Sequence, residues 1–174
     1  MLIINYEGAN IAFKDVFYQY CKLKEGYRNS VYKDHKGFDT IGIGHLVTGS
    51  EPFHVVAGKT YTDSQIKQLF DLDYDRLGIE AFAEEIKAAG YTGYNMMLAV
   101  SHFVWAHGGG QYRTSTLRKG LLANQYDLST VKAYLKANWD LRSAPNQRVN
   151  AEDFEVGFSP TPWQPGFTLP SRSN

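Results

Sequence analysis

Two carboxylates and a hydroxyl in the first quarter of the chain could together cleave a glycosidic bond. Glu25 precedes Asp34 by nine residues, and Thr40 follows Asp34 by six. This reaction needs one carboxylic acid to protonate the leaving oxygen and a second carboxylate across the sugar, about 6.5–9.5 Å away in inverting enzymes. The spacing alone is weak evidence, because about one chain in thirty would contain it by chance.

The surrounding sequence predicts the elements that would position these residues. From Asn10 to Lys24, apolar side chains recur at spacings of three and four, which predicts an amphipathic helix that ends near Glu25-Gly26. The end of a helix carries partial negative charge, which favours a protonated carboxyl and suits a general acid. Short apolar segments at 31–32, 38–43 and 55–56, separated by turn residues, predict a small sheet that contains Asp34.

The remainder of the chain is predicted to be mainly helical. Thr62 and Gln65 form a capping-box pattern that opens a long helix through about Lys87, with Gly78 as a weak point. Residues 92–107 are apolar on nearly every side, which indicates the buried centre of a helical lobe. Further helices are expected at about 115–124 and 129–139. After Pro145 the pattern is irregular, and the proline-rich end predicts an extended arm or a disordered tail.

Composition narrows the classes of function. Lys and Arg together number 18, as do Asp and Glu, so the net charge gives no general attraction to nucleic acid. Cys21 is the one cysteine, which excludes an internal disulfide and a cysteine zinc cluster. The N-terminal segment lacks the pattern of a signal peptide, and no stretch approaches 18 apolar residues, so we expect no membrane insertion.

The residues around Glu25, Asp34 and Thr40 in the sequence form a longer recognisable motif. Residues 24–49, KEGYRNSVYKDHKGFDTIGIGHLVTG, closely resemble the active-site segment of the bacteriophage lysozymes. That segment has a Glu-Gly pair, an Asp nine residues after the Glu, a Thr six after the Asp, and Ile-Gly-x-Gly-His. The resemblance implies that Glu25 is the general acid and that Asp34 stabilises positive charge on the sugar or helps to activate water. It implies that Thr40 orients the attacking water, giving inversion.

The resemblance continues more thinly along the chain. YTDSQIKQLFDLDYD resembles the start of the family's linking helix, which implies a His45–Asp73 pair that stabilises the fold. VSHFVWAHGGG and RTSTLRKGL resemble the central helix and the next turn. By that match the sugar groove would be lined by Leu46, Trp105, Ser115 and Thr116. Where the family has an Arg-rich stretch, NQRVNAEDF keeps Arg148 alone, which is assigned as the partner of Glu25.

We therefore expect an α+β, lysozyme-like, two-lobed fold, with a small antiparallel sheet lobe and a mainly helical C-terminal lobe joined by a long helix. A single domain would comprise an N-terminal extension and first helix (1–27), a β lobe (28–62), a linking helix (63–88), a helical lobe (89–156) and a proline-rich tail (157–174). The resemblance implies hydrolysis of the β-1,4 bond between N-acetylmuramic acid and N-acetylglucosamine in bacterial peptidoglycan. No cofactor or metal is implied.

The resemblance also implies a biological setting. In one setting, a monomer would accumulate in the host cytoplasm before lysis and reach periplasmic peptidoglycan through a separate holin. In the other, the protein would be delivered by a virion. Two other functions stay open: a lytic transglycosylase, which needs Glu25 but neither Asp34 nor Thr40, and a wall-binding or virion module without turnover. His45, His102 and several serines suggest a Ser-His-Asp hydrolase, but no Gly-x-Ser-x-Gly is present. The histidines form no HExxH pair, which argues against a zinc amidase.

Overall fold

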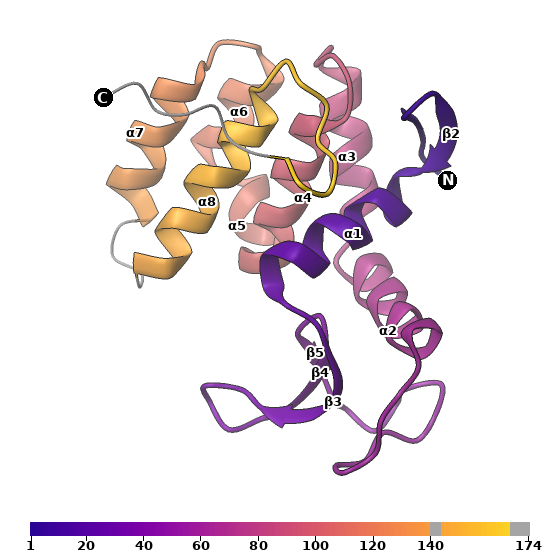
Figure 1. Ribbon diagram of the computed structural model, residues 1–174. Coiled ribbons are helices and arrows are strands. Elements are labelled where there is room, and N and C mark those ends of the chain that lie inside the picture. Colours follow the sequence, from indigo (N-terminus) through magenta and orange to yellow (C-terminus); the bar gives the residue numbers. More distant parts are fainter. Residues whose placement is uncertain (140–143, 168–174) are drawn as a thin grey trace.

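A small β lobe lies below a larger helical body in the computed structural model, which describes residues 1–139 and 144–167, and the side chains of 1–139 and 150–167 (Figure 1). Strands β3 (Arg28–Lys33), β4 (Asp39–Gly42) and β5 (His45–Leu46) form an antiparallel sheet in the order β3-β4-β5. Ile41 and Tyr61 bury this lobe's own small core against helix α2 (Asp63–Arg76). The predicted α+β class is confirmed.

Helix α1 (Phe13–Glu25) leads from the helical body to the β lobe. Its buried side chains include Phe13, Phe17 and Tyr20, which belong to the apolar stripe that predicted this helix. The helix ends at Gly26, whose φ of 80° favours glycine. Its predicted start was early, because residues 9–12 are paired as a strand.

An N-terminal hairpin precedes α1 and was not predicted. Strands β1 (Ile3–Tyr6) and β2 (Ala9–Ala12) pair antiparallel, with Tyr6 opposite Ala9. The turn between them uses positive φ at both Glu7 and Gly8, which is the geometry of a two-residue hairpin loop. Each strand has four residues, too few to show a clear alternation of apolar and polar positions.

The predicted single linking helix is two helices. The capping box that starts α2 is present, because Thr62 Oγ1 accepts from the Gln65 N–H at 3.1 Å and the Thr62 N–H donates to Gln65 Oε1 at 2.9 Å. Helix α2 then stops, and α3 (Ile79–Ala88) begins after Gly78, which has φ 66° and ψ 30°. Left-handed backbone cannot continue a right-handed helix, so Gly78 separates the two segments rather than weakening one.

The helical body is built around α4 (Asn95–His107), which is buried on nearly every side as predicted. Helix α4 packs against α3 and against α8 (Ala144–Gly157), and α7 (Leu128–Trp139) packs on α8. Helices α5 (Gly109–Arg113) and α6 (Thr116–Leu122) complete the body. The prediction of irregular structure after Pro145 was wrong, because residues 144–157 form α8, which contributes the buried Phe154 and Val156 to the core although half of its residues are polar.

The segment after α8 is an ordered arm as far as residue 167, and Figure 1 shows it in yellow running back past α4. Asn95 holds it: Asn95 Nδ2 donates to the carbonyls of Ser159 and Thr161, and Asn95 Oδ1 accepts from the Trp163 N–H. Trp163 is buried against Tyr20. Of the two predictions for this segment, the extended arm is therefore correct for 158–167, and 168–174 lie outside the described residues.

Two smaller observations complete the fold. Val55-Val56, expected in the sheet, is not in a strand; the Val56 N–H donates to the hydroxyl of Tyr61 at 2.8 Å instead. Within the described part of the chain, no helix has both the length and the apolar character needed to cross a membrane.

Candidate active site

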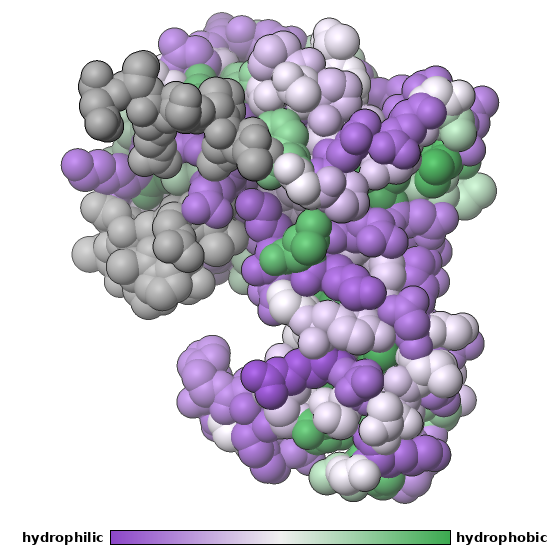
Figure 2. Space-filling model, in the orientation of Figure 1, coloured by the Kyte–Doolittle hydropathy of each residue, from purple (hydrophilic) through white to green (hydrophobic). Residues whose placement is uncertain are grey.

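A cleft of about 480 Å³ lies between the β lobe and the helical body. Figure 2 shows the surface hollowed between these two parts. Helix α1, the β lobe, the end of α4 and the middle of α8 all contribute to its lining, which includes Glu25, Tyr32, Asp34, His35, Thr40, Leu46, Trp105, His107 and Asn150. Glu25, Asp34 and Thr40, which we singled out from sequence, therefore share one cleft.

Glu25 is the last residue of α1, and its side chain is 34% exposed, so the carboxyl is held by the body yet reaches the cleft. Its Oε1 lies 2.6 Å from Nε2 of His102, a residue of α4. His102 is fully buried, and its other nitrogen, Nδ1, lies 2.5 Å from Oδ2 of Asp153 on α8. The hydroxyl of Tyr20 on α1 donates to the second oxygen of Asp153. These contacts form a chain from the cleft into the core.

These contacts change the pKa values of Glu25 and His102. The hydrogen bond with His102 lowers the pKa of Glu25, against the opposing effect of burial, and the nearby His102 and His107 charges add to the lowering. Burial disfavours a charge on His102, but Asp153 and Glu25 outweigh it and raise the pKa of the imidazole to about 9. The two pKa shifts, in opposite directions, both favour an ion pair between a charged His102 and an ionised Glu25 at neutral pH.

Asp34 and Thr40 both hydrogen-bond to the backbone of one residue of the β3–β4 hairpin, Phe38. Asp34 Oδ1 accepts from the N–H groups of Phe38, at 2.9 Å, and Lys36, at 2.8 Å. The Phe38 hydrogen bond is the largest cause of a lowered pKa of Asp34, which keeps this carboxyl ionised. The carbonyl of Phe38 accepts from the Thr40 hydroxyl at 3.1 Å, which leaves the hydroxyl oxygen able to accept from water.

The predicted groove residues divide into two groups. Leu46, which is 49% exposed, and Trp105, which stacks on Phe70 with ring centroids 4.9 Å apart, both line the cleft. Ser115 and Thr116 are not among its lining residues. Ser115 is the N-cap of α6, where its hydroxyl accepts from the Arg118 N–H at 3.1 Å, so its polar group is already engaged by the helix.

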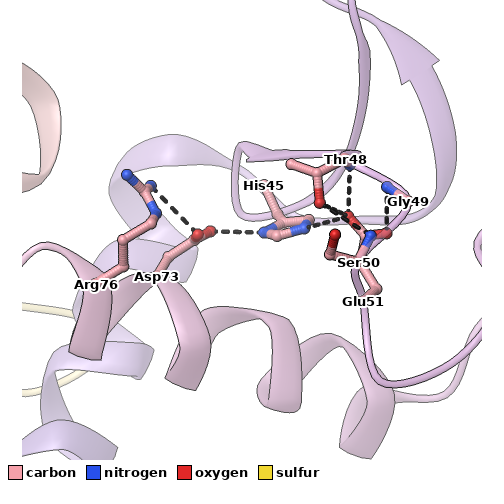
Figure 3. A network of polar contacts seen from close by, with 7 residues as sticks. All are labelled: His45, Thr48, Gly49, Ser50, Glu51, Asp73 and Arg76. Atoms are coloured by element: carbon pink, nitrogen blue, oxygen red, sulfur yellow. Dashed lines mark hydrogen bonds and ion pairs between the residues drawn. The ribbon is translucent and has the colours of Figure 1, made fainter.

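The contact expected between His45 and Asp73 is present. His45 Nδ1 lies 2.8 Å from Asp73 Oδ2, and its Nε2 lies 3.0 Å from Glu51 Oε1 (Figure 3). Glu51 also accepts from the N–H groups of Thr48 and Gly49, so it ties the loop after β5 to the histidine. The network joins the sheet to α2 and does not line the cleft.

The partner assigned to Glu25 from sequence, Arg148, has a side chain outside the described residues. Sequence analysis did not find the buried partners: His102 was weighed for other chemistries, and neither Asp153 nor Tyr20 was singled out. One signal was available, since His102 is an ionisable residue in the middle of a mainly apolar helix. Among the described residues, no group of three or more His, Cys, Asp or Glu could hold a metal ion.

A small sheet lobe and a helical body that enclose a cleft with a partly buried glutamic acid on one side and an ionised aspartate on the other define the lysozyme class of glycoside hydrolases. Comparison with known proteins narrows this class. The sequence profile described as Phage lysozyme matches residues 22–150, and the chain therefore belongs to the phage lysozyme family. It is a glycoside hydrolase that degrades peptidoglycan.

Several solved structures share this fold. An endolysin from an Escherichia coli O157:H7 phage, FAHEc1, is 19% identical, with a TM-score of 0.64 over 90% of this chain and 98% of its own. The muramidase domain of SpmX from Asticaccaulis excentricus is 18% identical, with a TM-score of 0.58 over 83% and 96%. A mutant of P22 lysozyme is 21% identical, with a TM-score of 0.57 over 82% and 92%. Among curated protein sequences, none matches this chain.

Proposed function

We propose that this lysozyme hydrolyses the β-1,4 bond between N-acetylmuramic acid and N-acetylglucosamine with inversion at the anomeric carbon. The observation that carries the proposal is the shared cleft, in which Glu25 faces the hairpin that holds Asp34 and Thr40. Inversion requires about 6.5–9.5 Å between the two carboxyls, so that a water molecule fits, and here the two carboxyls reach one cleft from separate elements.

The roles of the three residues follow from their surroundings. Glu25 is partly buried and is hydrogen-bonded to a group that can carry its proton, so it acts as the acid on the leaving oxygen. Asp34 is ionised and exposed to the cleft, so it stabilises positive charge on the sugar and accepts the proton of the attacking water. Thr40 is buried beside it with a free lone pair, so it orients that water.

The setting we propose is lysis of a bacterial host, in which a monomer moves from the host cytoplasm to the periplasmic peptidoglycan through a separate holin. The fold similarity to a phage endolysin supports this setting. The substrate-binding surface would include Leu46 and Trp105, one on each side of the cleft, with Trp105 offering an aromatic face to a sugar ring.

The test uses purified peptidoglycan and three proteins: wild type, Glu25→Gln, and Glu7→Gln as a matched control. Glu7-Gly8 is the same dipeptide as Glu25-Gly26 but is exposed in the N-terminal hairpin. We expect Glu25→Gln to lose activity by at least about 100-fold, the usual contribution of a general acid, and Glu7→Gln to keep it. Equal activity of the three proteins would refute the role of Glu25.

The products distinguish the remaining possibilities. Hydrolysis leaves a reducing end, and NMR of the fresh product would show the α anomer if the reaction inverts a β bond. A 1,6-anhydro end would instead identify a lytic transglycosylase, and absence of any new end would identify a wall-binding module.

A further inference from the structure

We propose that Glu25 and His102 hold one acidic proton in common, and that Asp153 acts through His102 to keep this proton in the pair for delivery to the substrate. The inference rests on the proposed function of Glu25 as the general acid. It adds His102 and Asp153 as positioning residues, since neither reaches the cleft.

The geometry requires a proton in both of the short gaps beside His102. Its two ring nitrogens lie 2.6 Å from Glu25 Oε1 and 2.5 Å from Asp153 Oδ2, distances at which an unprotonated nitrogen and a carboxylate oxygen would repel each other. A neutral imidazole has one N–H, which satisfies one gap. The other gap is filled by a second proton on His102 or by a proton on the carboxyl that faces the bare nitrogen. Because the Tyr20 hydroxyl already donates to Asp153, Asp153 serves as an acceptor on both sides, and the carboxyl that takes this proton is Glu25.

These two arrangements carry the same number of protons. With a charged His102, both carboxyls are ionised and the three groups have a net charge of −1. With a neutral His102 and a protonated Glu25, the net charge is again −1. Transfer across 2.6 Å between Nε2 and Oε1 converts one into the other without exchange with solvent. The proton therefore belongs to the pair, not to one residue.

Sharing resolves a conflict within the site. The His102 contact lowers the pKa of Glu25. If Glu25 titrated independently with this lowered pKa, it would be ionised at neutral pH and could not act as an acid. The pair, however, loses its proton only when His102 also loses it, and the pKa of His102 is raised to about 9. The acid thus stays available through the neutral range.

Asp153 positions the His102 imidazole by hydrogen bonding to its Nδ1. It is fully buried, and the hydroxyl of Tyr20 donates to its second oxygen. The other titratable groups near the pair are few in the described part of the chain. They are Cys21 and Lys24 on α1, His107 on α4, Glu152 on α8, and Tyr32, Asp34 and His35 across the cleft.

The reaction balances with this proton. It passes from His102 Nε2 to Glu25 Oε1, and the Glu25 carboxyl gives a proton to the glycosidic oxygen. The bond between that oxygen and the anomeric carbon breaks, and its electron pair stays with the oxygen. Water adds to the anomeric carbon and loses one proton to Asp34, which passes it to solvent. Solvent then returns one proton to the pair.

The experiment measures kcat/KM on purified peptidoglycan from pH 5 to 9 at constant ionic strength. His102→Gln keeps a neutral donor near Glu25, and Asp153→Asn keeps an acceptor for His102 without its charge. His45→Gln is the matched control, because His45 also lies between two carboxylates but does not contact Glu25. We expect both test variants to lose activity at lower pH than wild type, with at least about tenfold less activity at pH 8 relative to pH 5. The control keeps the wild-type profile once activity is expressed per folded protein at each pH.

A lowered activity with an unshifted profile in His102→Gln and Asp153→Asn would mean that His102 only packs the site, and would overturn the inference. NMR of the His102 ring nitrogens in folded wild type gives a second reading: titration near pH 9 supports the inference, and titration below 7 overturns it. If Glu25→Gln is inactive while the profiles do not move, the inference alone fails. If Glu25→Gln is active, the proposed function itself fails.

Discussion

His102 Nε2 lies 2.6 Å from Glu25 Oε1, although the two residues are 77 positions apart in the chain. Helix α1 brings the carboxyl to the edge of the cleft, and α4 brings the imidazole to it from the core. Asp153 on α8 contacts the other ring nitrogen of His102, so three helices, α1, α4 and α8, support the side of the cleft that carries Glu25. The opposite side is supported by one hairpin, and the two sides respond differently to substitution.

Asp34→Asn should remove activity and leave stability nearly unchanged. Asn can still accept from the N–H groups of Phe38 and Lys36, so the hairpin keeps its shape, but the negative charge beside the sugar is lost. We expect a fall of at least about 100-fold in kcat. Asp39→Asn, in the same hairpin but outside the cleft lining, is the control and should keep its activity. A similar loss in both variants, measured on purified peptidoglycan, would contradict a specific role for Asp34.

Stability should depend on pH through His45. Burial opposes the charge on His45, but hydrogen bonds with Asp73 and Glu51 outweigh it and raise the pKa of the imidazole. A raised pKa means that this stabilisation is complete below the unfolded value of about 6.5 and is lost as pH rises through the folded value. We expect His45→Gln to cost about 3 kcal/mol at pH 5.5 and less at pH 8.5, measured by urea unfolding.

The range chosen for that experiment isolates the histidine. Burial opposes ionisation of Glu51, but hydrogen bonds from Thr48 and His45 lower the pKa of Glu51 to about 2, so its own contribution is lost only below pH 5. His35→Gln, at an exposed position, should show no cost at either pH. If the loss of unfolding free energy in His45→Gln became larger as the pH rises, the predicted direction of the pH dependence would be contradicted.

Gly42→Ala should destabilise the β lobe more than Gly44→Ala. Both glycines have positive φ, 68° and 70°, so each substitution carries the backbone cost of about 1–2 kcal/mol. A Cβ at Gly42 would also lie 3.0 Å from Ile66 Cγ2, whereas one at Gly44 meets nothing within 4 Å. We expect an extra cost of about 1 kcal/mol at Gly42, since overpacking must move Ile66 or the strand. Equal free energies of unfolding for the two variants would mean that Ile66 on α2 can move away from the added methyl group without cost.

Trp105 should report substrate binding. Trp139 and Trp163 are buried, so Trp105, in the cleft lining, is the tryptophan that a glycan can contact. Titration of a muropeptide into Glu25→Gln should change the tryptophan fluorescence, and a further Trp105→Phe substitution should remove that change. Trp105→Ala should weaken binding about tenfold through loss of aromatic contact. A fluorescence change that survives Trp105→Phe would place the glycan elsewhere.

Most of the fold could be predicted from local patterns. The stripe of Phe13, Phe17 and Tyr20 predicted α1, and the Thr62–Gln65 capping box predicted the start of α2. The hairpin β1–β2, the break at Gly78 and helix α8 were missed. In each case the deciding factor lies outside the local pattern: two short strands that pair with each other, one backbone conformation, and a helix with as many polar as other residues, stabilised by packing on α4.

The candidate site divides in the same way. Glu25, Asp34 and Thr40 lie within one short segment, and the resemblance of that segment to the active-site segment of the bacteriophage lysozymes indicated them, since their spacing alone is weak evidence. His102 and Asp153 come from α4 and α8, and their contact with Glu25 exists only because three helices pack together. Local sequence determines backbone conformation through sterics and hydrogen bonds between near neighbours. Which buried side chain meets which carboxyl depends on packing between distant segments, and only the tertiary structure decided that.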